Sequence, residues 1–213
     1  MRERHIFVIA IAAALCIAPA LALTAYAAPS LWNRNLVVDG NFEQSPVNTN
    51  ASNTVVAPGW TFHDGMTALA YGTSGGYLMP NDPGPPDRGK SYVSGGEDAR
   101  STGEQSIDVS SGATRIDAGG VQYEFSAWLG GWGGQSDYAT ASASFLDASG
   151  HTLASASLGG EPAAAWPKSE LLAHAAHGTV PKGTRSVHVV ITAVREEGSW
   201  NDGSIDDVSI VLK

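Results

Sequence analysis

Short runs of alternating apolar and polar residues account for most of this chain beyond residue 30. In Tyr123–Leu129 every second residue is apolar, and Val187–Val194 shows the same two-residue period. This period is typical of β-strands that have one face in a core and the other toward solvent or a ligand. Trp128 falls on the face of its segment where a polar residue would be expected.

Turn residues separate these runs at short intervals. Gly, Pro, Asn and Asp bound nearly every apolar segment, and the segments show no βαβ alternation. About ten strands at such spacing predict an all-β fold, an antiparallel β-sandwich of the jelly-roll kind. We expect strands at Leu36–Val38, Trp60–His63, Ser91–Val93, Glu104–Val109, Tyr123–Leu129, Ala139–Leu146, Thr152–Leu158, Ser186–Val194 and Ser204–Leu212.

One segment leaves the choice between helix and strand open. Alanine is frequent in Ala163–Ala176, which favours a helix, but Pro162 and Pro167 interrupt the pattern. A strand flanked by a short turn fits the same residues. Within this segment His174 and His177 are a weak candidate for a metal pair, since residues three apart on a strand point to opposite faces.

The first 27 residues have the features of a secretory signal. Arg2 and Arg4 give a basic start, Ile6–Leu23 is almost entirely apolar, and Ala25–Ala27 supplies a small-x-small cleavage pattern. A membrane anchor is the alternative, because the apolar run nearly reaches spanning length. The cleavage pattern favours export, so we expect residues 1–27 to be a signal peptide, residues 28–213 to form one domain, and the protein to be secreted.

Composition narrows the classes of partner. The 213-residue chain has 12 basic and 21 acidic residues and a formal net charge of −9, and its one cysteine lies inside the leader. A disulfide-free exported domain must be stabilised by core burial or metal. An acidic surface repels phosphate backbones, so we expect no nucleic-acid partner, and after cleavage no membrane. Neutral sugars and cations remain compatible, and we expect a monomer.

Both ends of the mature chain carry a carboxylate on a short apolar segment. The closing run Ser204–Leu212 places Asp206 on the same pleat face as Val208, Ile210 and Leu212, so we expect Asp206 to point toward the core. An unpaired buried carboxylate is costly and needs a cation or several donors. Two such carboxylates on neighbouring terminal strands indicate bound Ca²⁺, although donors from the backbone or a buried Arg are the alternative.

Two aromatic, polar segments precede strands and are candidates for a sugar-binding platform. Indole rings stack on the C–H faces of pyranoses, and amides or carboxylates at the rim bind the hydroxyls. The alternative is that these tryptophans only cap loops, whereas Trp60 is expected in the core. The candidate ligand-binding residues are Trp132, Gln135, Asp137, Trp200, Asn201 and Asp202.

Several motifs resemble the galactose-binding-like β-sandwich superfamily, which includes many carbohydrate-binding modules of secreted bacterial enzymes. The resemblance rests on the opening Asn35–Glu43, on Pro58-Gly59-Trp60 and on the closing Ser204–Leu212, and it extends over nearly the whole mature chain. It implies a β-sandwich, non-catalytic carbohydrate binding and a structural Ca²⁺ near the chain ends. The positions that match the metal ligands of the family are Glu43 and Asp206.

Catalytic motifs are not evident in the sequence. No Gly-x-Ser-x-Gly elbow and no His-Glu-x-x-His occurs, and Glu196-Glu197 point in opposite directions if the chain is extended there. We therefore expect no enzyme. Two alternatives stay open: a protein-interaction module that uses the Trp128 face or the loop Pro80–Gly89, and a small secreted hydrolase.

Overall fold

The computed structural model describes residues 30–160 and 166–213, so the predicted leader lies outside the described residues. Ten strands, a 3₁₀ turn at Ser110–Gly112 and one short helix, α1 (Ala113–Ala118), make up its regular structure. The strands are β1 (Thr61–His63), β2 (Thr67–Ala70), β3 (Ser91–Ser94), β4 (Arg100–Asp108), β5 (Gln122–Gly131), β6 (Tyr138–Leu146), β7 (Thr152–Gly159), β8 (Glu170–Thr179), β9 (Ser186–Val194) and β10 (Ser204–Leu212).

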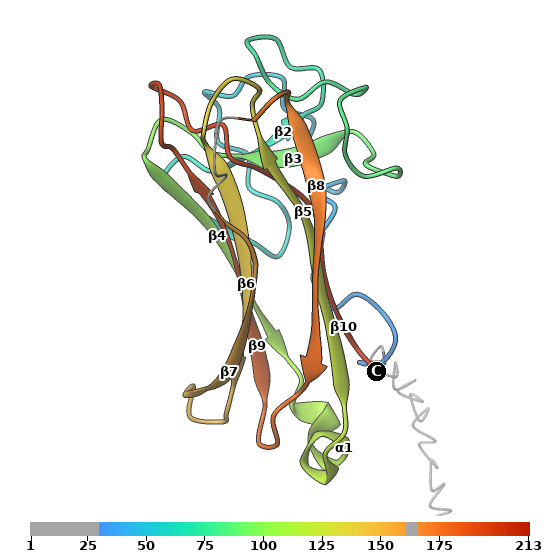
Figure 1. Cartoon of the computed structure of the whole chain (residues 1–213). Helices are drawn as coiled ribbons and strands as arrows, with labels where there is room; N and C mark the ends of the chain where they lie inside the picture. Colours follow the sequence, from blue (N-terminus) through green and yellow to red (C-terminus); the bar gives the residue numbers. More distant parts are fainter. Residues whose placement is uncertain (1–29, 161–165) are drawn as a thin grey trace, which may run out of the picture.

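These strands form two five-stranded antiparallel sheets that pack face to face (Figure 1). The strand orders are β1-β4-β9-β6-β7 and β2-β3-β10-β5-β8. From β4 onward the chain changes sheet at nearly every connection, which gives the jelly-roll arrangement of a closed two-sheet sandwich. The predicted fold class, which the family resemblance also implied, is confirmed.

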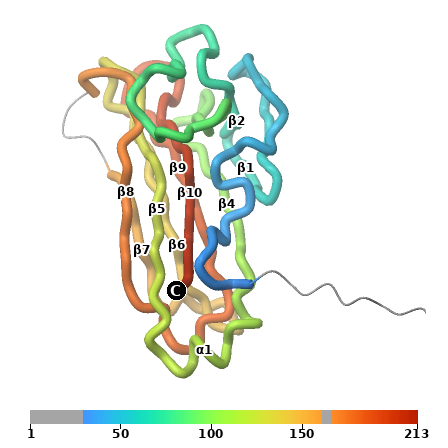
Figure 2. The backbone as a smooth tube through the Cα atoms, turned by 90° about the vertical axis from the view of Figure 1, so that its right-hand side faces the viewer, coloured from blue at the N-terminus to red at the C-terminus, as the bar shows by residue number. Residues whose placement is uncertain are grey.

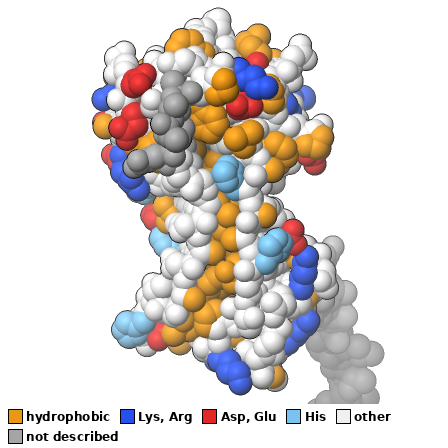
Figure 3. Space-filling model, viewed as in Figure 1, with side chains coloured by type: hydrophobic (Ala, Val, Ile, Leu, Met, Phe, Trp, Pro, Cys, Tyr) orange, Lys and Arg blue, Asp and Glu red, His pale blue; other side chains and the backbone are white. Residues whose placement is uncertain are grey.

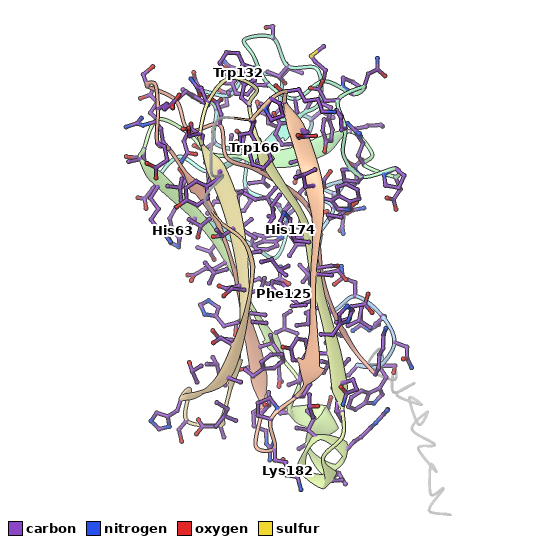
Figure 4. The ribbon with its side chains drawn as sticks, viewed as in Figure 1. His63, Phe125, Trp132, Trp166, His174 and Lys182 are labelled. Carbon is purple, nitrogen blue, oxygen red and sulfur yellow. The ribbon has the colours of Figure 1, made fainter. Side chains whose placement is uncertain are left out.

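The core lies between the sheets and follows the alternation in the sequence. Phe125, Val189 and Ile191 have no exposed surface, and Figure 4 shows Phe125 between the two layers. Trp60 is also buried, as expected, and its indole N–H donates to the Asp39 carbonyl at 3.3 Å. Because their polar neighbours face outward, the long strands bury one face each.

The first described segment runs beside β10, as the sequence predicted (Figure 2). The Leu36 amide donates to the Ile210 carbonyl at 2.9 Å, and the Val208 amide donates to the Gly40 carbonyl at 2.8 Å. Residues 36–38 do not form the expected strand; isolated bridges lie just before them and join Trp32 to Leu212 and Asn35 to Val211. The two ends of the described chain are thus held together by backbone hydrogen bonds.

A β-bulge in β10 reverses the expected orientation of Asp206. Asp206 pairs with Trp128 and Ser209 with Ser126, so β10 has one residue more than β5 between these pairs. The extra residue, Asp207, has φ 47°, a left-handed conformation. The bulge shifts the pleat by one residue, and the prediction that Asp206 shares a face with Val208 is wrong. Asp206 lies on the outer face of its sheet, with Trp128.

The ambiguous segment is a strand where the structure describes it. β8 covers its second half and pairs with β5 along its whole length, while residues 163–165 lie outside the described residues. His174 pairs with Ala127 and His177 with Glu124, so the two rings point to opposite faces, as predicted. Within residues 30–160 and 166–213, no helix has the length and apolar character needed to cross a membrane.

Candidate functional site

Three loops meet at the end of the sandwich opposite α1. They are residues 71–90 between β2 and β3, residues 132–137 between β5 and β6, and residues 195–203 between β9 and β10. Figure 4 shows Trp132 at this end and Lys182 at the other. Binding residues concentrate in loops that a rigid scaffold positions, so this end is the first place to look for a site.

Asp137 joins two of these loops. Its Oδ1 accepts the amides of Glu196 and Glu197 at 2.8 and 3.0 Å, and its Oδ2 accepts the amide of Asp202 at 2.9 Å. The side chain has no exposed surface. Asp137 therefore fixes the loop geometry and does not face a ligand, although the sequence suggested a ligand-binding role.

Asn201 has the same kind of structural role. Its side-chain amide donates to the carbonyls of Asp98 and Ala193, and its Oδ1 accepts the Gly203 amide at 3.2 Å. It is completely buried, and Gly95 packs so closely that a Cβ there would lie 2.5 Å from the Asn201 amide carbon. Of the six candidate ligand-binding residues, Asn201 and Asp137 are thus unavailable to a ligand in this structure.

Three aromatic side chains from the three loops line one cavity of about 250 Å³, which we call the aromatic cavity. Trp132 and Trp200, both predicted as sugar platforms, lie in it together with Asp202 and with Tyr77, which the sequence analysis did not select. Trp132 is 38% exposed, so its ring is open to a ligand. The remaining lining residues are Gly75 and Gly76.

Packing sets the orientation of these rings. The rings of Tyr77 and Trp200 meet edge to face, with centroids 6.2 Å apart and an interplanar angle of 80°. Gly76 has φ 96°, and a Cβ at this position would lie 3.3 Å from the Trp132 ring. Glycine is therefore needed here both for its backbone conformation and for the close approach of the loop to the indole.

Asp202 is the ionisable group of the aromatic cavity. Burial, and next the negative charge of Asp137, raise the pKa of Asp202 to about 7. Burial and the Asp202 charge raise the pKa of Tyr77 to about 12, so this phenol keeps its proton at neutral pH. The cavity thus combines three π-faces, one phenol donor and one carboxyl group, a combination suited to hydroxylated rings.

Gln135, the remaining predicted residue, is not among the residues that line the aromatic cavity. Its Oε1 and the Trp200 Nε1 are buried without a protein hydrogen-bond partner in the described part of the chain. Buried polar atoms are nearly always paired in folded proteins. Both atoms lie in the loops that meet at this end of the sandwich, at residues 132–137 and 195–203.

The predicted metal residues lie at the junction of the terminal segments. Asp206 has no exposed surface, and its carboxylate accepts the Tyr71 hydroxyl at 2.7 Å and the Asp207 amide at 2.8 Å. The Oε1 of Glu43 accepts the amides of Lys90 and Ser91 at 2.7 and 2.8 Å. Burial is the main cause that raises the pKa of Asp206 to about 8; the charge of Asp207 and, to a smaller extent, that of Glu43 add to it, while the hydrogen bond from Tyr71 opposes it.

This carboxylate pair fits a hard cation in its charge and its donor atoms. A buried carboxylate that lacks a cationic neighbour is stabilised when a divalent ion binds, and Ca²⁺ takes about six to eight oxygens. Glu43 and Asp206 supply two carboxylates, and the described residues contain no cluster of three or more His, Cys, Asp or Glu that could hold a metal. Backbone carbonyls would have to complete such a site.

Two other hollows lie on the sandwich itself. A polar one of about 520 Å³ lies over the bulge and is lined by Asp207, Asp87, Trp128 and Asn41 among others. An apolar one of about 400 Å³ is lined by residues of β5, β6, β7 and β8, among them Leu129, Ala139 and Leu172. Figure 3 shows hydrophobic side chains in a stripe along that face.

Comparisons with known proteins give only distant likenesses. No protein-family model matches the sequence, and no curated protein matches it. The chain is similar to the enzymatically active domain of tailspike protein 4 of bacteriophage CBA120, with 18% identity and a TM-score of 0.46 over 84% of this chain and 21% of that one.

Two further likenesses involve xylanases. One is to the CBM22-1–GH10 modules of xylanase 10B of Clostridium thermocellum, complexed with xylohexaose, with 19% identity and a TM-score of 0.43 over 73% of this chain and 26% of that one. The other is to the CBM22-1 xylan-binding domain of Xyn10C of Paenibacillus barcinonensis, with 13% identity and a TM-score of 0.40 over 72% and 85%. The chain spans about a quarter or less of the tailspike and xylanase 10B chains. At these identities and TM-scores, the likeness carries no inference about ligand or activity.

Proposed function

We propose that this chain is an exported, non-catalytic glycan-binding protein whose ligand occupies the aromatic cavity. The observation that carries the proposal is the convergence of Tyr77, Trp132 and Trp200 with Asp202 in one hollow, from three separate loops. Sugar rings present apolar C–H faces that stack on indole or phenol, and their hydroxyls bind carboxyl groups and phenols. All four side chains are of these kinds.

The arrangement of carboxyl groups favours binding over catalysis. Glycoside hydrolysis generally needs two carboxyl groups that flank the scissile bond. Asp202 is the only carboxyl group among the residues that line the aromatic cavity, and its neighbour Asp137 is committed to three backbone amides. Glu196 and Glu197 lie in an exposed turn, as the sequence suggested.

A glycan array followed by isothermal titration calorimetry tests the proposal. Trp132→Ala should weaken binding of the selected glycan about tenfold, because a stacked aromatic contact contributes roughly 0.5–1.5 kcal/mol beyond area burial. Trp32→Ala is the matched control, since Trp32 packs under Arg115 far from the loop end, with 4.2 Å between the guanidinium carbon and the ring centroid. Equal affinities of wild type, Trp132→Ala and Trp200→Ala would refute the site.

We also propose that Glu43 and Asp206 hold a structural Ca²⁺. The ion would neutralise the carboxylates of Glu43 and Asp206, of which Asp206 is fully buried, and would tie the first described segment to β10. Its role would be stability, because a fully coordinated Ca²⁺ leaves no open position for chemistry. The support is the buried carboxyl group of Asp206, whose ionised form burial disfavours unless a cation is bound, and the oxygen-only donor set.

Thermal unfolding with and without chelator tests the calcium site separately. An ion at about 100 times its Kd stabilises the native state by about 2.7 kcal/mol, which corresponds to a Tm shift of roughly 5–10 °C in a domain of this size. Glu43→Gln and Asp206→Asn should abolish the shift, and the exposed control Asp108→Asn should retain it. A wild-type Tm that EGTA leaves unchanged would contradict the proposal.

A further inference from the structure

The Trp200 indole is shared by two cavities. It lines the aromatic cavity, and it also lines a hollow of about 240 Å³ whose other walls come from different loops. We call this hollow the second cavity. Its lining residues other than Trp200 are Ala51, Ser52, Thr54, Gly65, Gly96, Glu97 and Asp98.

Each cavity is of a size that suits one small ring. Pockets that enclose drug-sized ligands measure roughly 300–1,000 Å³, and both hollows fall below that range. A ligand that fills one of them and continues past Trp200 would reach the other. The shared indole therefore makes the two hollows neighbouring compartments of one binding surface.

The second cavity offers polar groups that no protein contact occupies. Ser52, Thr54 and Asp98 are exposed, and their side-chain oxygens make no hydrogen bond within the described part of the chain. Its glycine wall is tightly built, because a Cβ at Gly96 would lie 2.6 Å from the Gly65 carbonyl oxygen. Hydroxyl and carboxylate oxygens at the rim, with an indole on one side, match the edge of a second sugar ring.

The charges of both hollows select against acidic ligands. Glu97 and Asp98 border the second cavity, Asp202 borders the first, and neither lining includes Lys or Arg. Arg195 reaches this region, but its guanidinium donates to the carbonyls of Glu97 and Ser199. A uronate or sulfated sugar would meet the negative charges of Glu97 and Asp98 in the second cavity and, where Asp202 is ionised, its charge in the aromatic cavity.

From these observations we infer that the loop end is an extended groove with two subsites on either side of Trp200, which binds two adjacent units of an uncharged oligosaccharide chain. This inference rests on the proposed glycan-binding function and specifies its ligand class. Trp132 and Tyr77 provide the first subsite, and Ser52, Thr54 and Asp98 provide the polar rim of the second.

Calorimetric titration with neutral oligosaccharides of one to four units, built from the sugar that the array selects, tests the inference. The affinity should rise at least tenfold from one unit to two and change little beyond that. Thr54→Ala and Asp98→Ala should each lower the affinity for the two-unit ligand several-fold and leave the one-unit affinity unchanged. The matched controls Thr152→Ala, on an exposed end of β7, and Asp108→Ala, at the exposed end of β4, should behave as wild type.

The outcomes separate the two claims. The two-subsite groove would be overturned if one-unit and two-unit ligands bound with equal affinity and Thr54→Ala and Asp98→Ala left that affinity unchanged. If Trp132→Ala still weakened binding, the glycan-binding function would stand. Preference for a uronate-containing chain would also overturn the inference. If the folded wild-type protein bound none of the neutral glycans, both the groove and the glycan-binding function would be overturned.

Discussion

Removal of the Asp137 carboxylate should separate the loops that build the aromatic cavity. Asp137→Ala deletes an acceptor of three backbone amides, at 2.8, 3.0 and 2.9 Å, from a fully buried position. Hydrogen bonds to charged groups contribute about 1.5–3 kcal/mol each, and bonds that share one acceptor are not additive. Loss of the Asp137 charge also favours the ionised form of Asp202, and this offsets part of the loss of unfolding free energy.

The expected net loss of unfolding free energy is about 3–5 kcal/mol, or roughly 6–20 °C in Tm for a domain of this size. Urea unfolding followed by tryptophan fluorescence measures it, and an unchanged slope would show that the loss is one of stability. Asp147→Ala is the matched control. Asp147 also accepts three donors, two amides and the His151 ring, but in an exposed turn, so its removal should cost less.

Glycan affinity supplies a second readout of the same perturbation. The Asp202 amide is one of the three donors that Asp137 holds, so Asp137→Ala should displace Asp202 and Trp200 and weaken binding even where the protein remains folded. Asp147→Ala should leave affinity unchanged. If Asp137→Ala lowers the free energy of unfolding by less than about 1 kcal/mol, or by no more than Asp147→Ala does, Asp137 does not hold the two loops together as argued.

Three further predictions follow from other contacts. The pKa of Asp202 is raised to about 7 in the folded protein, so the stability that Asp202 contributes is complete below its unfolded pKa and is lost as pH rises through 7. In saturating Ca²⁺, the Tm of Asp202→Asn should therefore fall less between pH 5 and pH 8 than the Tm of wild type. Parallel Tm curves for the two proteins would contradict this. Gly76→Ala should weaken glycan binding because its Cβ presses on Trp132, whereas Gly150→Ala, also at positive φ but with nothing within 4 Å, should cost similar stability and no affinity; calorimetry of both variants decides. Gly40→Ala should destabilise by at least about 2 kcal/mol, because its Cβ would lie 2.1 Å from the Val208 carbonyl oxygen, while the half-exposed neighbour Val38→Ala should change little; equal Tm values would argue against the packing of the first segment on β10.

Most of the sandwich could be predicted from the sequence because its strands are long and half-buried. The periodicity placed β5, β6, β7, β9 and β10 within a few residues of their observed bounds. The strand β2 was missed because its four residues, Thr-Ala-Leu-Ala, include no aromatic and only one β-branched residue, whereas the equally short and buried β3 contains Tyr92 and Val93. The segment Ala163–Ala176 fitted a helix or a strand by its sequence, and the pairing of its second half, in β8, with β5 decides for a strand.

The candidate site was predictable only in part. The sequence indicated Trp132, Trp200 and Asp202, which share a cavity. The same mixture of aromatic and polar residues also led to the selection of Asp137 and Asn201, which are buried and bind backbone groups of the loops. Polarity alone does not tell whether a loop side chain binds backbone amides or a ligand. Tyr77 was missed although it follows Gly75-Gly76, a pair that indicates a loop able to approach another element closely.

The orientation of Asp206 shows a second kind of limit. A strict two-residue period places Asp206 with Val208, and a single inserted residue in β10 cancels that relation. The local signal was the Asp206-Asp207 pair, since Asp tolerates the left-handed conformation that Asp207 adopts. Asp206 is buried nonetheless, because the residues that cover the outer face of the sheet, Tyr71 among them, enclose it.

The claim that the aromatic cavity binds glycan is tested most directly by a crystal structure of the protein with a neutral oligosaccharide that the array has selected. The account predicts one sugar ring stacked against Trp132 or Trp200 within hydrogen-bond reach of Asp202. A glycan bound elsewhere, over Trp128 or on the face of β9 and β6, with the aromatic cavity empty, would contradict it.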